Sequence, residues 1–264
     1  MEAGGTVEVP PVPRPPVGCR PVTNTPDPSA GQRDDADADG EGVRQERFTT
    51  PPGATTLLLV RHGESQPAHP DRPFPLVDGH GDPPLHTTGL AQADAVGAWL
   101  SARHHDGEPI DAIYVTTLQR THQTAAPLAA ALGMAPSVEA DLREVHLGEW
   151  EGGAFRSKIR DDADLAARMM TEERWDVLPG SEPLEAFEAR IIAGLGRIIA
   201  AHPDQRVVVV AHGGVIAHLL HLATGSRRFA FLGVDNGSIS ELVAGPDHQR
   251  VRSYNQTSHL PAWE

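Results

Sequence analysis

Two short apolar runs, each followed at once by a histidine, constrain the fold of this chain most. Residues 55–60 are all leucine or β-branched and lead into Arg61-His62, and residues 207–211 are all valine or alanine and lead into His212. Such runs are typical of strands buried on both faces, as in a parallel sheet. Because the carboxyl ends of parallel strands meet at one edge, where open α/β sheets bind ligands, we expect His62 and His212 to face one crevice.

The rest of the chain alternates expected strands and helices, which predicts an α/β fold. Thr87 or Thr88 is expected to cap the first helix, and Gly133 to close the second. The architecture expected is a three-layer αβα sandwich with a mostly parallel central sheet and a final hairpin, turning at residues 245–247, at its edge. The expected strands are 55–61, 110–116, 206–211, 239–243 and 250–254, and the expected helices are 89–103, 118–132, 157–172, 183–201 and 213–222.

Residues 1–53 differ in composition from the rest. They hold ten of the 24 prolines and the acidic run 34–39, with few large apolar residues. Such a segment cannot bury enough apolar surface to offset the entropy of ordering it. We therefore predict a disordered tail over residues 1–53 and one catalytic domain over residues 54–264. A docking arm for a partner protein is the alternative for the tail.

Composition excludes several classes of function. The net charge of -14 argues against nucleic-acid binding, which needs a basic face. The N-terminal residues 1–5 lack the basic start and apolar core of a signal peptide, and the longest apolar runs are far too short to cross a bilayer. The single cysteine, Cys19, fits a reducing compartment. We expect a soluble cytoplasmic protein without nucleic-acid or membrane partners.

Basic side chains gather where the expected strands end. Arg61 and His62 follow one strand, His212 follows another, and Arg120 lies just after a third. A planar guanidinium can hold two phosphate oxygens at once, and the amides that open the helix at Gly213 add further donors. The sequence therefore predicts an anion site that suits a phosphate group.

Five segments carry a resemblance to a known family. In order along the chain, the segments are Leu-Val-Arg-His-Gly-Glu-Ser at 59–65, Leu-His-Thr-Thr-Gly-Leu-Ala-Gln-Ala at 85–93, Thr-Thr-Leu-Gln-Arg-Thr-His-Gln-Thr-Ala at 116–125, Leu-Arg-Glu-Val-His-Leu-Gly-Glu-Trp-Glu-Gly at 142–152 and Val-Val-Ala-His-Gly-Gly at 209–214. On these segments the chain resembles the histidine phosphatase superfamily, also called the phosphoglycerate mutase-like family, and in particular its phosphatase-type branch. The resemblance covers about residues 55–255.

The resemblance implies a phosphomonoesterase that acts on a small phosphorylated metabolite without metal or cofactor. It implies that neutral His62 attacks phosphorus and becomes a phosphohistidine. Glu144 would protonate the leaving alkoxide and then take a proton from water. The phosphoryl oxygens would be held by Arg61, Arg120, His212 and Gly213.

Other functions remain open at this point. A cofactor-dependent phosphoglycerate mutase would use the same residues but return the phosphoryl group to substrate. A binding module without activity would keep the fold alone. Sugar phosphates, phosphoglycerate-like acids and phosphorylated cofactors are all candidate substrates, and a homodimer is neither predicted nor excluded.

The chain departs from the family pattern near its first motif. Many members carry an asparagine phosphate contact where this chain has Ala68, and we expect that contact to be missing or supplied by Gln66. Trp150 is interpreted as a packing residue. His218 and His221, without a visible carboxylate partner, are interpreted as core or solvated histidines rather than metal ligands.

Overall fold

The computed structural model describes residues 45–69, 71–245 and 249–261. Most of the predicted disordered tail, residues 1–44, lies outside these ranges, and so do residues 246–247 of the predicted hairpin turn. Residues 45–53, which the structure does describe, contain no helix or strand. All the helices and strands in these described ranges belong to one unit, Phe48–Glu264.

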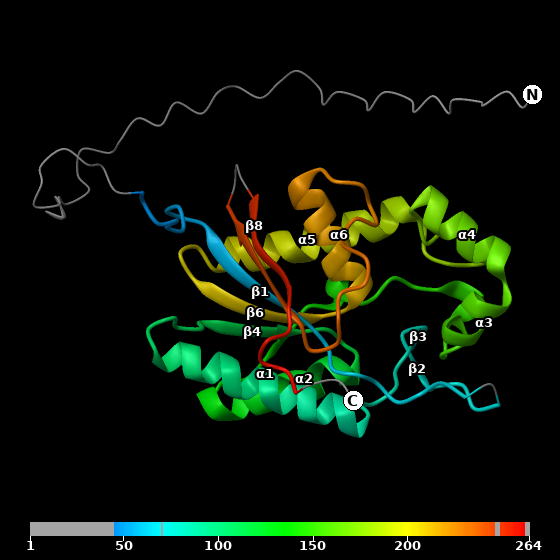
Figure 1. Cartoon of the computed structure of the whole chain (residues 1–264), viewed down its shortest axis with the longest axis horizontal. Coiled ribbons are helices and arrows are strands. Elements are labelled where there is room, and N and C mark those ends of the chain that lie inside the picture. The colour runs from blue at the N-terminus through cyan, green and yellow to red at the C-terminus, as the bar shows by residue number, and fades with distance from the viewer. Residues whose placement is uncertain (1–44, 70, 246–248, 262–264) are drawn as a thin grey trace, which may run out of the picture. The chain divides into compact units, whose positions relative to one another are not determined.

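A six-stranded, mostly parallel sheet forms the centre of this unit (Figure 1). Its strand order is β5-β4-β6-β1-β7-β8, and β5, β4, β6 and β1 run parallel. The β7-β8 hairpin is antiparallel and lies at one edge, as predicted. The strands are β1 (Thr55–Arg61), β4 (Ala112–Val115), β5 (Ser137–Val138), β6 (Arg206–Ala211), β7 (Ile239–Ala244) and β8 (Gln249–Gln256).

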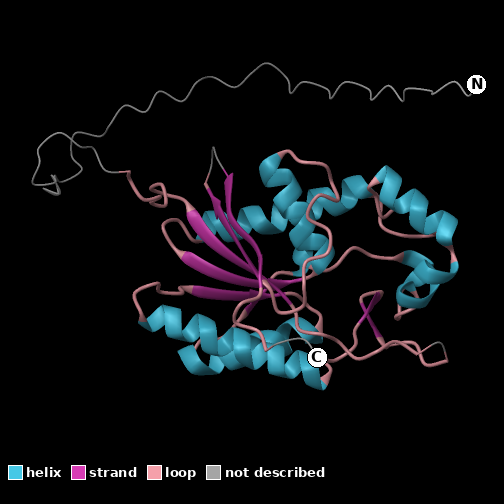
Figure 2. Ribbon diagram, viewed as in Figure 1, coloured by secondary structure: helices cyan, strands magenta, loops and turns pink. Residues whose placement is uncertain are grey.

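Helices cover both faces of the sheet, which confirms the three-layer prediction (Figure 2). On one face, Leu58 and Val60 of β1 pack with side chains of α1 (Thr87–His105) and α2 (Gln119–Leu132). Leu57 and Leu59 point to the other face, because side chains alternate along a strand. There they join a core with α5 (Leu184–Ala201) and α6 (Gly213–Thr224). No helix in the described ranges has the length and apolar character that a bilayer crossing requires.

The long connections carry structure that the sequence pattern did not predict. The loop after β1 contains a small hairpin, β2 (Leu76–Val77) with β3 (His80–Gly81). The single helix predicted over 157–172 is wrong, because two helices, α3 (Phe155–Asp161) and α4 (Ala163–Glu172), occupy this region. Asp162 separates them by leaving helical backbone angles and accepting a hydrogen bond from Leu165 N at 3.0 Å, as an N-cap does.

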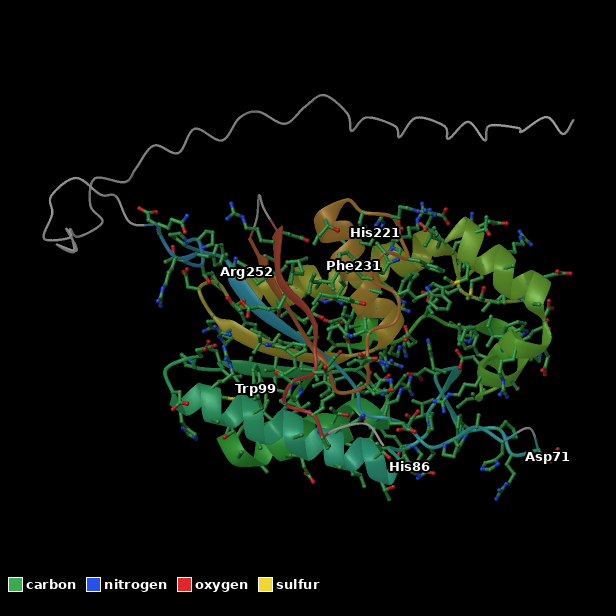
Figure 3. The ribbon with its side chains drawn as sticks, in the orientation of Figure 1. Asp71, His86, Trp99, His221, Phe231 and Arg252 are labelled. Atoms are coloured by element: carbon green, nitrogen blue, oxygen red, sulfur yellow. The ribbon has the colours of Figure 1, made fainter. Side chains whose placement is uncertain are left out.

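The ends of the first two long helices show one correct and one incorrect prediction. Neither Thr87 nor Thr88 caps α1. The cap is His86, whose backbone is extended and whose Nδ1 accepts from Thr88 N at 3.4 Å (Figure 3). Gly133 closes α2 in a left-handed conformation, with φ of 64°, as predicted.

Candidate active site

The two strand-end histidines meet at one edge of the sheet, as predicted. Strands β1 and β6 are parallel neighbours, with Arg61 opposite Ala211 in the register. His62 N donates to Ala211 O at 3.0 Å, so the residues that follow each strand start side by side. The imidazole rings of His62 and His212 stack edge to face, with centroids 5.2 Å apart.

The hydrogen bonds of His62 define which of its ring nitrogens carries the proton. Nδ1 lies 2.7 Å from the carbonyl oxygen of Gly63, which can only accept, so Nδ1 carries the proton. Nε2 accepts from Nε of Arg120 at 3.2 Å and is therefore unprotonated. Burial, and then the positive charges of Arg120 and Arg61, hold the pKa of His62 well below its usual value of 6.5. The ring is thus neutral near pH 7, and the electron pair of its unprotonated Nε2 faces the Arg120 guanidinium.

Arg120 lies in the first turn of α2, which starts just beyond the end of β4. Besides its contact with His62, its NH1 donates to Gly81 O at 2.9 Å. Asp82 is 3.9 Å from the same NH1 and also accepts from Gln119 N at 2.9 Å. These contacts fix a buried guanidinium beside His62, and burial lowers its pKa.

His212 is completely buried behind His62. Its Nε2 lies 3.0 Å from Oγ1 of Thr116, the residue after β4. Its Nδ1 is buried and has no hydrogen-bond partner among the described residues. Burial, followed by the charge of Arg120, lowers the pKa of His212 well below 6.5. His212 therefore adds a neutral ring with one uncommitted nitrogen.

Arg61 and Gly213 lie on the other side of His62. The Arg61 NH1 group donates to the carbonyl of Val234, while its buried Nε has no partner within the described part of the chain. A Cβ at Gly213 would lie 3.2 Å from that Nε, so the absence of a side chain leaves room for the guanidinium. Buried cationic N–H groups without protein acceptors are the donors that an anion would satisfy.

Glu144 lies against the first turn of α6. Its Oε2 accepts from Gly214 N at 3.1 Å, and its Oε1 accepts from Val145 N at 3.0 Å. The Glu144 backbone is also held, because its carbonyl accepts from Arg190 at 2.8 Å and from His80 at 3.1 Å. A helix N-terminus attracts a carboxylate, so this position is favourable for the Glu144 side chain.

A pocket of about 460 Å³ connects these residues. Arg61, His62, Arg120 and Glu144 line it, whereas His212 is buried behind its wall. Every predicted site residue thus lies in or directly beneath one pocket. Gly213, which was predicted to bind the phosphoryl group, and Gly214, the next residue of the same motif, also line the pocket.

Arg156 and His80 line the pocket but were not predicted from the sequence. Gln66, expected as a substitute contact, is not among the lining residues, and its side chain donates to Leu85 O at 3.4 Å. Arg156 of α3 reaches this region instead and donates to Ser65 Oγ at 2.6 Å. Arg156 lies one residue before the expected polar helix, and its partner Ser65 lies 91 residues away in the chain, so no local sequence signal pointed to it.

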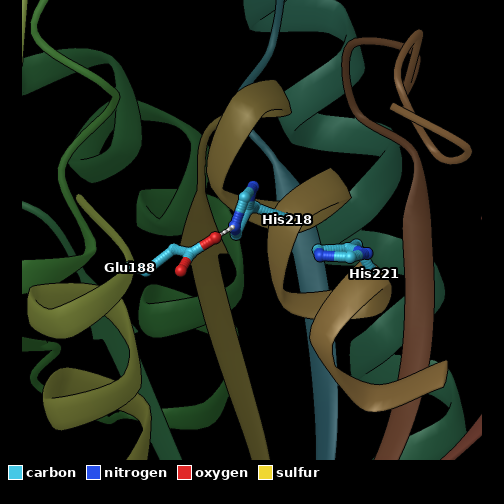
Figure 4. Close-up of side chains that lie close together, drawn as sticks. All are labelled: Glu188, His218 and His221. Atoms are coloured by element: carbon cyan, nitrogen blue, oxygen red, sulfur yellow. Dashed lines mark hydrogen bonds and ion pairs between the residues drawn. The ribbon is translucent and has the colours of Figure 1, made fainter. Parts of the chain in front are cut away.

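A second group of titratable side chains lies away from this pocket (Figure 4). His218 Nε2 on α6 is 2.9 Å from Oε1 of Glu188 on α5, and His221 lies beside them, with all three potential ligand atoms within 4.8 Å. The prediction that no carboxylate faces these histidines is wrong. His218 is 2% exposed, and Arg228 lies 3.8 Å from the same Glu188 oxygen. The arrangement links α5 to α6 through a partly buried polar contact.

Known proteins similar to this chain include phosphatases, which fits a pocket lined by cations and a histidine. The chain matches the histidine phosphatase superfamily (branch 1) over residues 57–257. A bifunctional protein of Mycobacterium tuberculosis is 32% identical over 242 residues, which cover 88% of this chain but only 64% of that relative. The chain therefore spans less than two thirds of the length of such relatives.

Solved structures share the fold. The mycobacterial glucosyl-3-phosphoglycerate phosphatase has a TM-score of 0.63 and 26% identity, covering 77% of this chain and 99% of that one. A phosphoglycerate mutase from Bacillus anthracis has a TM-score of 0.65 and 22% identity, covering 80% and 97%, and shows the likeness of fold alone. The chain belongs to branch 1 of the histidine phosphatase superfamily.

Proposed function

We propose that this protein is a metal-independent phosphomonoesterase that hydrolyses a small phosphorylated metabolite through a phosphohistidine on His62. The observation that carries the proposal is the unprotonated Nε2 of His62, held beside the Arg120 guanidinium. A neutral imidazole with an unprotonated nitrogen is a nucleophile once a phosphoryl group replaces the Arg120 hydrogen bond, and the adjacent cation attracts that phosphoryl group. The phosphatase named among the solved structures supports the same reaction.

In the first proposed step, His62 Nε2 forms a bond to phosphorus while the bond between phosphorus and the alcohol oxygen breaks. Glu144 in its acid form gives its proton to that oxygen, so a neutral alcohol leaves. The uncommitted Nε of Arg61 and Nδ1 of His212, together with Arg120, supply donors for the phosphoryl oxygens.

In the second proposed step, the Glu144 carboxylate takes a proton from water. The resulting hydroxide attacks phosphorus, the bond between phosphorus and Nε2 breaks, and the electron pair returns to His62. Inorganic phosphate leaves, and Glu144 is again protonated. The cationic side chains neutralise the phosphoryl charge in both steps, which is the role that a metal ion fills in other phosphatases.

Release of inorganic phosphate from a panel of phosphomonoesters, in the presence of a chelator, tests this function. We expect turnover by the full chain and none by His62→Ala. Turnover that requires added 2,3-bisphosphoglycerate, with transfer to phosphoglycerate rather than water, would replace the phosphatase with a mutase. Phosphomonoester binding without turnover by the unaltered chain would indicate a binding module.

We also propose a cellular location and a kind of binding partner for the enzyme. The lone cysteine and the acidic composition support a cytoplasmic enzyme whose partner is a small substrate rather than nucleic acid or a membrane. Fractionation of cells that express the tagged chain tests the location.

A further inference from the structure

The pocket has two chemically different parts. Its floor holds the cations, His62 and Glu144 that the proposed reaction uses. Its outer wall is mainly apolar and is built from segments far apart in the sequence. The apolar side chains that form it include Phe74, Trp150, Phe155, Met169, Trp175 and Leu232.

Aromatic rings give this outer wall a fixed surface. The ring of Phe155 lies between Trp150, at 6.1 Å, and Trp175, at 6.0 Å, measured between centroids. Trp175 is supported from behind by Phe229 at 5.3 Å. Trp150 is 4% exposed, which agrees with its predicted packing role. Phe155 and Trp175 are only partly buried, so they keep ring surface available to a ligand.

Two polar side chains of the outer wall, Glu151 and Ser65, are already paired with protein groups. Both carboxylate oxygens of Glu151 accept backbone hydrogen bonds, from Gly81 N at 2.7 Å and Leu147 N at 2.9 Å. Ser65 Oγ accepts from Arg156, which also donates to Gln66 O at 2.9 Å. Among the described lining residues, no amide or hydroxyl side chain other than Ser65 is present. A leaving group rich in hydroxyl groups would lose hydrogen bonds to water where it lies against the apolar rings.

We propose that the outer wall binds the leaving group and selects phosphomonoesters of flat, apolar alcohols over sugar phosphates and phosphoglycerate-like acids. The selection arises from burial of an aromatic or similarly apolar group against Phe155 and Trp175. The carboxylate of a phosphoglycerate-like acid would lose its hydration against the same apolar rings. This inference rests on the proposed phosphatase function and adds the chemical class of its substrate.

Two substrates with leaving groups of similar basicity test the inference. Both 2-phenylethyl phosphate and ethyl phosphate release a primary alcohol, so a difference in kcat/KM reports on the ring rather than on the chemistry. We expect kcat/KM for 2-phenylethyl phosphate to be about ten- to a hundredfold higher, mostly through KM. Equal values, or a preference for glycerol 1-phosphate or 3-phosphoglycerate, would overturn the inference.

Substitutions then test which residue causes the preference for 2-phenylethyl phosphate over ethyl phosphate. Trp175→Ala should remove most of this preference. Trp175→Phe should keep it, since a phenylalanine ring also presents an apolar face. Trp99→Ala is the matched control, because Trp99 lies on α1 against His259 and outside the pocket (Figure 3). The readout is the ratio of two substrates in one preparation, so a partly unfolded variant still gives a valid value. A Trp175→Ala enzyme that keeps the preference of the parent would contradict the assignment.

The outcomes separate this inference from the function on which it rests. If both substrates are hydrolysed equally and phosphate is found on His62, the leaving-group site is wrong and the phosphatase stands. If neither substrate is hydrolysed and His62 carries no phosphate, the phosphatase proposal fails as well.

Discussion

Nε2 of His62 lies 3.2 Å from Nε of Arg120, in a buried contact between the end of β1 and the first turn of α2. An arginine cannot accept this hydrogen bond, so the histidine must offer its electron pair. The same contact therefore fixes the tautomer of His62 and places a cation where a phosphoryl group would arrive. The two residues act as one unit in the predictions that follow.

Replacing Arg120 by Gln should lower kcat/KM by about 10²–10³-fold, because a cation that faces the transferring phosphoryl group is lost. Steady-state kinetics on a single phosphomonoester measures this. Arg103→Gln is the control, since Arg103 pairs with Glu108 on the surface of α1. An Arg120→Gln enzyme as active as the control would remove this residue from the reaction.

Replacing Glu144 by Gln should show its effect through the leaving group. An alkyl phosphate needs a proton donor, and its turnover should fall by about 10²–10⁴-fold. The first step with 4-nitrophenyl phosphate should be nearly unaffected, because that leaving group departs without a proton. Burst and steady-state rates on both substrates measure this.

The control for this prediction is Glu149→Gln, an exposed carboxylate five residues along the chain. It should leave both rates unchanged. If Glu144→Gln and Glu149→Gln behave alike on alkyl phosphates, the acid must be another residue.

Gly214→Ala should displace the Glu144 carboxylate. An added Cβ would lie 2.5 Å from Glu144 Oε1, too close for the side chain to stay in place. We expect alkyl phosphate turnover to fall by about 10²-fold, as misplacement of a catalytic group by about 1 Å does. Kinetics on the alkyl and nitrophenyl esters should match the pattern of Glu144→Gln.

Gly196→Ala provides the matched control, since a Cβ there meets nothing within 4 Å and the residue lies within α5. It should keep full activity and raise the free energy of unfolding by up to about 1 kcal/mol, the difference between alanine and glycine in a helix. Equal activity in both alanine variants would show that Gly214 does not position Glu144.

Stability should depend on pH through His62 and His212, two of the buried histidines. The pKa values of His62 and His212 are well below 6.5 in the folded protein, chiefly through burial, whereas both rings protonate near 6.5 in the unfolded chain. Below that pH the unfolded chain binds protons that the folded protein does not. The free energy of unfolding should therefore fall with decreasing pH, by up to about 1.4 kcal/mol per pH unit for each ring.

Urea unfolding at several values between about pH 5 and 6.5 measures this slope. His62→Asn should make the free energy of unfolding less dependent on pH, because one of the two titrating rings is removed. A variant whose slope equals that of the parent protein would show that His62 titrates alike in the folded and unfolded states.

The sequence predicted the site floor better than its walls, for a physical reason. His62 and His212 follow buried strands, and parallel strands must bring their ends together. Arg120 follows a third strand of the same sheet. Trp175 and Phe74 both line the outer wall although they belong to loops far apart in the chain, and no periodic pattern predicts that they share a pocket.

Local polar contacts explain the other differences. Asp162 interrupts an apparently continuous helical pattern because its carboxylate caps the next helix. Arg156 lines the pocket and Gln66 does not, because α3 lies against the first motif and brings Arg156 to Ser65. Such contacts depend on how the folded chain brings distant segments together, and the preference of each residue for helix or strand does not predict this.

Direct capture of the phosphorylated enzyme tests the central claim best. The full chain and Glu144→Gln are mixed with 4-nitrophenyl phosphate, quenched in alkali, and digested for mass spectrometry. We predict one phosphoryl group per chain on His62, stable in alkali and lost in acid, which accumulates in Glu144→Gln and is absent from His62→Asn. Turnover without phosphate on any residue, or with phosphate on a residue other than His62, would contradict the account.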